Sequence, residues 1–198
     1  MQEVRDGGGG FLELLIAKVI LRFVRLLFKY KKYRYHRVVS LGDLLIDRTE
    51  KAEFLEFGQG ATIYDSSLVI GAVKAGKSTW IGPYTIIDGS GGLEIGDFCN
   101  ISAGVHIYTH DTVKRTLSGG KAESEHVPVR IGNCCYIGPH TIITKGTTIG
   151  NYCLIGANSL VTSDLNDYSI AAGSPCKIIG QVKIDEKGSV EFLMNKKD

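Results

Sequence analysis

Aliphatic residues recur at every sixth position through the second half of the chain. From residue 131 to residue 161 the series has no interruption and consists of Ile131, Ile137, Ile143, Ile149, Ile155 and Val161. Gly or Thr follows each of them, and Cys, Thr or Ser stands four places after each of the first five. A period of six belongs neither to an α-helix nor to simple strand alternation. It predicts a short strand followed by a corner, repeated many times.

The same register appears upstream in a less regular form. It runs from Phe57 to Ile87, shifts by two extra residues in the Ser90–Leu93 segment, resumes at Ile95 and breaks off over Tyr108–Arg130. Three six-residue steps close a triangular coil, and successive coils stack at the parallel-strand spacing of about 4.8 Å. Each coil therefore buries its aliphatic side chains only against its neighbours.

Three of the five cysteines, Cys99, Cys135 and Cys153, stand in the column of small residues. We expect them to be core filler rather than nucleophiles or metal ligands, because a free Cys behaves as a small buried hydrophobe. The number of cysteines is odd, they form no Cys-x-x-Cys pair, and no secretory signal precedes them. Reduced thiols in the cytosol are the expected state.

A different pattern precedes the repeat. Residues Phe11–Tyr30 are mostly aliphatic or aromatic, but interspersed charges leave no apolar run long enough for a membrane span or a signal peptide. On a helix, Lys18, Arg22, Arg25 and Lys29 fall on one narrow stripe. The pattern predicts an amphipathic helix that either lies on an anionic membrane or packs on the protein or a neighbouring subunit.

Charge is concentrated behind this helix. The net charge is +2, yet residues 18–37 hold eight Lys or Arg and no Asp or Glu, so the remainder of the chain is net acidic. Basic residues alternate with tyrosines in Lys29–Arg37, which suits the surface of an anionic membrane. Nucleic acid also binds such segments, but nothing downstream supports that function and none is predicted.

The repeat, together with its ending AAGSPCK (Ala171–Lys177), resembles the hexapeptide-repeat acyltransferases, which include galactoside, maltose and serine acetyltransferases. The resemblance covers roughly Phe57–Gly180 and is most specific over Ile131–Gly180. It is closer to the sugar O-acetyltransferases, because the large helical N-terminal domain of the serine enzymes is absent. It implies an all-β fold, a left-handed parallel β-helix of triangular 18-residue coils, assembled as a homotrimer. We expect an N-terminal helix and basic segment over 1–44, the β-helix over 45–180 with an excursion loop at 108–130, and a tail over 181–198.

Function is expected where the repeat breaks, because the regular coils offer little chemistry. In the resembled family a loop leaves the β-helix near this position with a catalytic His at its root, and His110 is the matching residue. An imidazole can take the proton of an attacking hydroxyl, and a backbone N–H can stabilise the oxyanion that forms. His106, His110, His126 and His140 could supply the three ligands of a zinc site of the gamma-class carbonic anhydrase type, but their spacing differs from the pattern of that family and no metal is predicted.

The resemblance also implies acetyl-CoA as cosubstrate, held in a groove between subunits. Its pantetheine would pair with backbone around Gly138, Pro139, Ala157 and Thr162, and Lys145 and Lys177 are candidates for the phosphates. Two positions depart from the family, since Ser163 stands where relatives usually carry Lys and Gly180 where some carry Arg.

Candidates for binding the acceptor are Asp88, Asp111 and Tyr136. A carboxylate at Asp88 suits sugar hydroxyls, although a turn-forming Asp fits the segment equally well. Asp111 could orient the imidazole of His110 instead, and Tyr136 could serve as an aromatic platform for a sugar face.

Together these features predict direct transfer of an acetyl group from acetyl-CoA to a hydroxyl of a sugar or lipid-linked surface glycan. The enzyme is expected in the cytoplasm, with peripheral contact to the inner face of the membrane. Two alternatives stay open: an N-acetyltransferase of an amino-sugar nucleotide, and a catalytically silent β-helix scaffold. Acceptor assays separate the first from the main prediction, and a measurement of coenzyme A binding separates the second.

Overall fold

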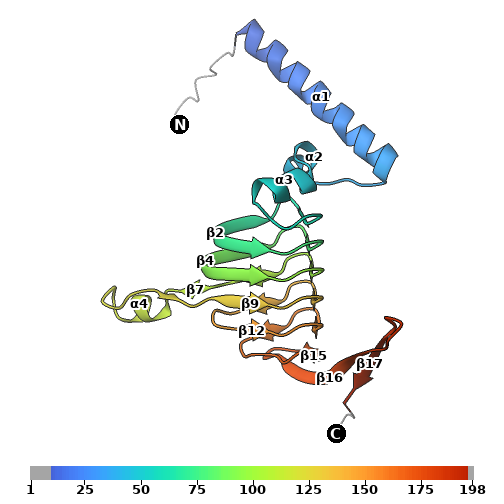
Figure 1. Cartoon of the computed structure of the whole chain (residues 1–198). Coiled ribbons are helices and arrows are strands. Elements are labelled where there is room, and N and C mark those ends of the chain that lie inside the picture. Colours follow the sequence, from blue (N-terminus) through green and yellow to red (C-terminus); the bar gives the residue numbers. More distant parts are fainter. Residues whose placement is uncertain (1–9, 196–198) are drawn as a thin grey trace. The chain divides into compact units, whose positions relative to one another are not determined.

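The computed structural model describes residues 10–195, and the chain divides into two compact units, Met1–Leu45 and Ile46–Asp198. The first unit contains α1 (Phe11–Tyr35) and α2 (Leu41–Leu45), and the second contains the β-helix (Figure 1). Residues 1–9 of the predicted N-terminal segment and 196–198 of the predicted tail lie outside the described residues.

Helix α1 covers the segment predicted from its amphipathic pattern and continues five residues further, to Tyr35. His36 ends it in the left-handed conformation and donates its backbone N–H to the carbonyl of Lys32 at 3.0 Å. None of its 25 residues is buried. Within residues 10–195, no helix has both the length and the apolarity that crossing a membrane requires.

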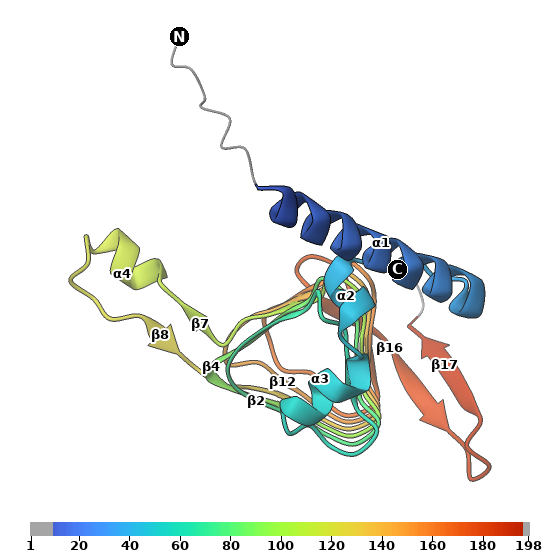
Figure 2. The ribbon, with the colours of Figure 1, turned by 90° about the horizontal axis from the view of Figure 1, so that it is seen from above.

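The second unit is the predicted parallel β-helix, and its cross-section is a triangle (Figure 2). Strand partners lie 18 residues apart in the regular coils, as Thr62 and Trp80 do, or Ile142 and Leu160. In Figure 1 the chain descends from the N-terminal to the C-terminal end of the stack, and the front strands β2, β4 and β9 all run from left to right. A coil that descends while its front strands run to the right is left-handed. The thirteen strands of the coils are β1 (Thr62–Ile63), β2 (Leu68–Ala75), β3 (Trp80–Ile81), β4 (Ile86–Ile95), β5 (Asn100–Ile101), β6 (His106–Ile107), β9 (Val129–Ile131), β10 (Tyr136–Ile137), β11 (Ile142–Ile143), β12 (Thr148–Ile149), β13 (Leu154–Ile155), β14 (Leu160–Val161) and β15 (Ser169–Ala172).

Three faces make up the triangle. Face 1 is formed by β1, β3, β5, β10, β13 and β15 in that order. Face 2 joins the first halves of β2 and β4 to β6, β11 and β14, and face 3 joins their second halves to β9 and β12. The two extra residues predicted near Ser90 appear as a register shift, because Gly71 pairs with Gly89 but Val73 pairs with Leu93.

The aliphatic column is the core. Members of this column are buried on every face, as Ile101 on face 1, Ile143 on face 2 and Ile149 on face 3 illustrate. Burying one such side chain is worth about 1.5–3 kcal/mol, so the repeated pattern itself supplies the stability of the stack. Cys99, Cys135 and Cys153 are buried as expected, and each thiol lies 3.0–3.1 Å from a carbonyl oxygen of the following coil.

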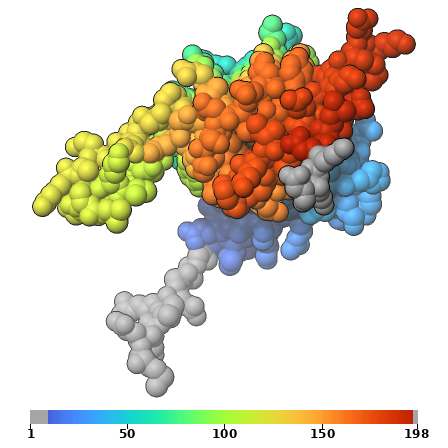
Figure 3. All heavy atoms as spheres, turned by 90° about the horizontal axis from the view of Figure 1, so that it is seen from below, coloured from blue at the N-terminus to red at the C-terminus, as the bar shows by residue number. Residues whose placement is uncertain are grey.

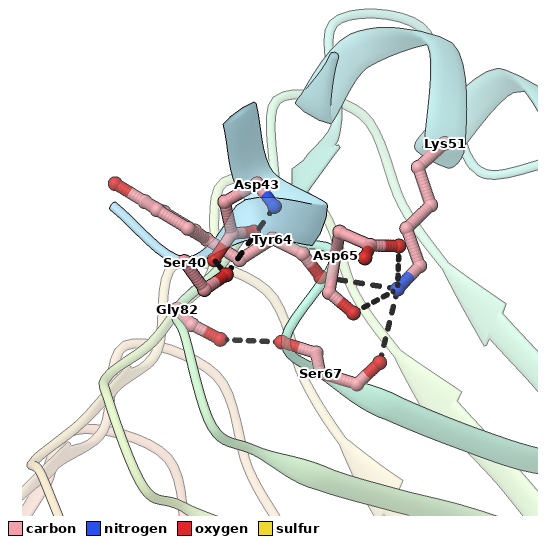
Figure 4. Close-up of polar contacts among 7 residues, drawn as sticks. All are labelled: Ser40, Asp43, Lys51, Tyr64, Asp65, Ser67 and Gly82. Carbon is pink, nitrogen blue, oxygen red and sulfur yellow. Dashed lines mark hydrogen bonds and ion pairs between the residues drawn. The ribbon is translucent and has the colours of Figure 1, made fainter. Parts of the chain in front are cut away.

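A short helix closes the N-terminal end of the stack. Helix α3 (Arg48–Phe54) starts at Asp47, whose side chain accepts the N–H of Thr49 at 2.8 Å. The ammonium group of Lys51 donates to the carbonyl oxygens of Tyr64, Asp65 and Ser67 at 2.9–3.2 Å (Figure 4). These carbonyls belong to the first corner, so Lys51 satisfies backbone groups that have no coil above them.

At the C-terminal end of the stack the chain reverses its direction. After β15 the chain forms an antiparallel pair, β16 (Lys177–Ile184) and β17 (Val190–Met194), which extends face 1 beyond the triangle (Figure 2). The described part of the segment set apart as a tail, 181–195, is thus largely strand. Seen from below, this hairpin and the excursion loop project from different sides of the β-helix (Figure 3).

Candidate active site

The excursion loop leaves the stack after face 2 and returns at face 3. It contains β7 (His110–Asp111), α4 (Val113–Leu117) and β8 (Glu125–His126). β7 and β8 pair antiparallel, which places His110 opposite His126 and Asp111 opposite Glu125. The loop therefore has an ordered two-stranded root that fixes the direction in which His110 leaves the β-helix.

Backbone contacts hold this root against the irregular spot in β4. The N–H of Gly91 donates to the hydroxyl of Thr109, and the N–H of Val127 donates to the carbonyl of Thr109, both at 2.8 Å. A Cβ at position 91 would lie 2.4 Å from the carbonyl oxygen of Thr109. Glycine is required there because the two backbones approach so closely.

Asp88 lies at the centre of a hydrogen-bond network beneath the root. Its Oδ1 accepts the N–H and the hydroxyl of Ser90, at 2.9 and 2.5 Å. Its Oδ2 accepts the N–H of Thr109 at 2.9 Å and contacts the Thr109 hydroxyl at 3.3 Å and Nδ1 of His110 at 2.7 Å. Burial alone would raise the pKa of this carboxyl, but the hydrogen bonds from Ser90, Thr109 and His110 outweigh it and hold the pKa far below its usual value.

The ionised Asp88 determines the tautomer of His110. A carboxylate only accepts hydrogen bonds, so Nδ1 of His110 must carry the proton that it shares with Oδ2. In the neutral ring Nε2 is then unprotonated and can accept a proton. The His110 side chain is 35% exposed, so this nitrogen is not sealed from a substrate. The ring stacks on His126 with the centroids 5.5 Å apart and the planes 16° from parallel.

Lys145 forms ion pairs with both strands of the root. Its ammonium group lies 2.8 Å from Asp111 Oδ2 and 2.5 Å from Glu125 Oε2, and Lys114 pairs with the other oxygen of Glu125. The hydrogen bonds to Asp111 and Glu125 raise the pKa of Lys145, and the Lys145 partner lowers that of Asp111. Lys145 and Asp111 are therefore partners of each other, and a phosphate or sugar would have to compete with this pairing.

The other predicted residues lie elsewhere on the β-helix. Gly138, Pro139 and Ala157 are at the corner between faces 1 and 2, Thr162 follows the end of face 2, and Lys177 begins β16. Tyr136 is on face 1 between Asn100 and Leu154. Within one subunit the structure thus brings Asp88, His110, Asp111 and Lys145 together and leaves Tyr136 on another face.

The remaining histidines do not join His110 in a metal site. His106 is on face 2, where its Nδ1 lies 3.3 Å from the Tyr108 hydroxyl, and His140 is at the corner that follows face 1. Among the described residues, no group of three or more His, Cys, Asp or Glu side chains is placed to hold a metal ion.

Ser90 and Thr109 are members of the site that were not predicted from the sequence. A Ser two residues after an Asp is the pattern of an Asx turn, in which the Asp side chain accepts the backbone N–H two residues on. That signal was present in Asp88-Gly89-Ser90. Thr109 had no comparable signal, because its partner Asp88 is 21 residues away in sequence.

Comparison with known proteins adds to this geometry. Residues 128–163 match the family model described as bacterial transferase hexapeptide (six repeats). The chain is similar to galactoside O-acetyltransferase of Escherichia coli (strain K12), with 27% identity over 57% of this chain and 65% of that protein. It is also similar to a probable acetyltransferase of Mycobacterium tuberculosis (strain ATCC 25618 / H37Rv), with 30% identity over 81% of this chain and 56% of that protein. The chain thus spans less than two thirds of the length of both curated relatives.

Among solved structures, the chain is similar to AntD, an N-acyltransferase from Bacillus cereus, in complex with dTDP and coenzyme A. The TM-score is 0.58 and the identity 28%, over 63% of this chain and 72% of that one. A second complex of AntD, with dTDP and 3-hydroxybutyryl-CoA, gives a TM-score of 0.57 and 29% identity over 62% and 70%.

Proposed function

We propose that this chain is a hexapeptide-repeat transferase that transfers an acetyl group from acetyl-CoA to a sugar hydroxyl, and the match of residues 128–163 to the family model and the β-helix support this proposal. One observation carries the proposal. His110 donates Nδ1–H to the buried carboxylate of Asp88 at 2.7 Å, which leaves Nε2 free to act as a base at the root of a projecting loop.

The reaction follows from that tautomer. Nε2 of His110 takes the proton of the acceptor hydroxyl while its oxygen attacks the thioester carbonyl. The C–O bond forms, the tetrahedral intermediate collapses and the C–S bond breaks. The imidazolium then returns its proton to the departing thiolate of coenzyme A. The negative charge of Asp88 stabilises the imidazolium during these steps, and no covalent enzyme intermediate is needed.

The cosubstrate is proposed to lie along the C-terminal coils, with its pantetheine against Gly138, Pro139, Ala157 and Thr162. Lys177 is exposed and is our candidate for a phosphate. Lys145 is a weaker candidate than its position suggested, because two carboxylates already neutralise it. Binding of coenzyme A, measured by calorimetry, tests this placement and excludes a silent scaffold if it is found.

For the acceptor, the roles of the three candidates differ. Asp88 and Asp111 are engaged with His110 and Lys145, which makes them positioning groups rather than free ligands for a sugar. Tyr136 is 45% exposed on face 1. Since it lies on a different face from His110, it can reach an acceptor at His110 only from a neighbouring subunit. We therefore propose a homotrimer with the cosubstrate between subunits, which light scattering would test.

A second candidate function is acylation of the amino group of a sugar nucleotide. The observation that favours it is the 28% identity to AntD, whose complex contains dTDP and coenzyme A. A base at Nε2 serves an amine as well as a hydroxyl. The deciding experiment incubates the purified protein with acetyl-CoA and matched sugars, amino-sugar nucleotides and lipid-linked saccharides, and locates the acetyl group by mass spectrometry. Absence of transfer to every hydroxyl acceptor, with transfer to an amine, would replace the first proposal by the second.

The N-terminal unit is proposed to hold the enzyme against the inner face of a membrane. Large apolar side chains of α1 such as Phe11, Leu15 and Phe23 are 47–84% exposed, and the basic stripe of Arg22, Arg25 and Lys29 runs along the same helix. This combination suits the interface of anionic lipids. Flotation with anionic vesicles at low and high salt tests it, since binding should weaken as salt rises. No binding at low salt would favour a packing role for the helix.

A further inference from the structure

The C-terminal hairpin has one apolar and one polar side. The pairs Val182–Phe192 and Ile184–Val190 share one side, whereas Lys183 and Glu191 share the other and lie 3.8 Å apart as an ion pair. Successive side chains in a strand point to opposite sides, so this alternation gives the hairpin one apolar side that is suited to packing against another surface.

The apolar side of the hairpin and face 1 of the β-helix enclose a groove of about 580 Å³. One wall is Tyr136, Tyr152 and Leu154, and the other is Val182, Val190 and Phe192. The groove is open, since Tyr136 is 45% exposed, Val190 56% and Phe192 55%. The hairpin is held to face 1 through β15, yet its apolar side stays open to water, and an exposed apolar patch of this kind marks an interaction site.

A matching apolar surface exists on face 2. Its outward residues Leu68, Ile86, His106, Ile142 and Leu160 occupy one register line that is apolar except at His106, with Leu68 53% and Ile142 38% exposed. We call this line the face 2 stripe. Face 3 is its opposite in character, because its outward line is Lys74, Glu94 and Arg130. Outward positions of a β-helix can carry charged side chains without cost to the core. A largely apolar line on one face therefore indicates that another protein surface covers this face.

We propose that the hairpin groove of one protomer receives the face 2 stripe of a second copy of this chain. The inference rests on the proposed homotrimer and specifies its contact. Groove and stripe are different surfaces on neighbouring faces of one triangular prism. A head-to-tail contact of this kind rotates each copy relative to the last, and it closes as a ring where that rotation is one third of a turn, as the proposed homotrimer requires. The charged face 3 stays in solvent.

The contact has a consequence for the active site. The face 2 stripe includes Ile86, two residues before Asp88, and the loop that carries His110 leaves the β-helix at the end of the same face. The hairpin of one protomer therefore lies beside the corner of its neighbour from which the loop that carries His110 leaves the β-helix. A site that is complete on both sides exists only in the assembled ring.

The test is the mass of the particle by light scattering, with full-length protein at one concentration. Phe192→Asp and Ile142→Asp change the groove and the stripe, and both should convert a trimer to monomer. Leu193→Asp is the matched control, because Leu193 is on the same strand, is 44% exposed and points to the polar side of the hairpin. It should remain trimeric. Far-UV circular dichroism must show that each variant retains the β-helix.

If Asp variants fail to fold, Phe192→Ser and Ile142→Ser are compared by dilution, and each should raise the dissociation concentration of the trimer at least tenfold. A wild-type trimer that Phe192→Asp leaves intact would overturn the groove contact while sparing the proposed trimer. A wild-type monomer that binds coenzyme A would overturn both. If Phe192→Asp stays trimeric but loses binding of a fluorescent fatty acyl probe, the groove holds an acyl chain and the contact proposal is wrong.

Discussion

Asp88→Asn is the sharpest test of how the site works. The substitution keeps the size of the side chain and replaces one oxygen by an amide nitrogen. Backbone N–H groups donate to both oxygens of Asp88, from Ser90 to Oδ1 and from Thr109 to Oδ2. Whichever position the amide nitrogen takes, it faces a backbone donor, and the N–H of either Ser90 or Thr109 loses its acceptor.

Two magnitudes follow. Hydrogen bonds to a charged group contribute about 1.5–3 kcal/mol each, so the loss of charge and of one acceptor should lower the free energy of unfolding by about 2–4 kcal/mol. For catalysis, an amide nitrogen near His110 donates to Nδ1 and moves the proton to Nε2, where it blocks base action. A fall of about 10²–10⁴-fold in kcat/KM is expected, the range that general-base catalysis supplies.

The assay measures release of free coenzyme A with a competent acceptor for the wild type, Asp88→Asn, His110→Ala and the double variant. If Asp88 acts through His110, then adding Asp88→Asn to His110→Ala should cost little further activity. Urea unfolding of each variant shows that the protein measured is folded. A folded Asp88→Asn enzyme within threefold of the wild-type kcat/KM would refute the tautomer argument, and so would full additivity in the double variant.

Three further outcomes are expected. His110→Ala should lose about 10²–10⁴-fold in turnover and keep its coenzyme A affinity by calorimetry, while His106→Ala should cost much less; the reverse order would show that the base is misassigned. Because the folded pKa of Asp88 lies below its unfolded value of about 3.9, its contribution to stability is present above about pH 4 and is lost as the pH falls further. Urea unfolding at pH 7 and pH 3 should therefore show a larger loss for wild type than for Asp88→Asn, and equal losses would contradict the network. Lys51→Met should lower the thermal midpoint, because three carbonyls of the first corner lose their donor, whereas Lys74→Met, which removes an exposed ion pair, should leave it unchanged.

The interior of the β-helix follows from the amino-acid sequence alone. Each coil must bury its aliphatic residue against the coils on either side, so the period of six specifies the inward positions one coil after another. The same logic located the two-residue shift beside Ser90, the position of the excursion loop and the buried state of Cys135. Helix α1 was also predictable, because its amphipathic pattern is local.

The roles of the outward and irregular residues emerge only in the folded chain. Asp88 and His110 are 22 residues apart, and the repeat does not specify their contact, because the chain has left the coil register before His110. Lys145 looked like a free cation in the sequence, yet the fold places it between Asp111 and Glu125 from the two strands of the loop root. The C-terminal hairpin is similar, since its alternation distinguishes an apolar side from a polar side but does not specify which surface covers the apolar side. The physical reason is common to all three: inward residues obey a repeated local constraint, whereas these contacts depend on how distant segments meet once the coils are stacked.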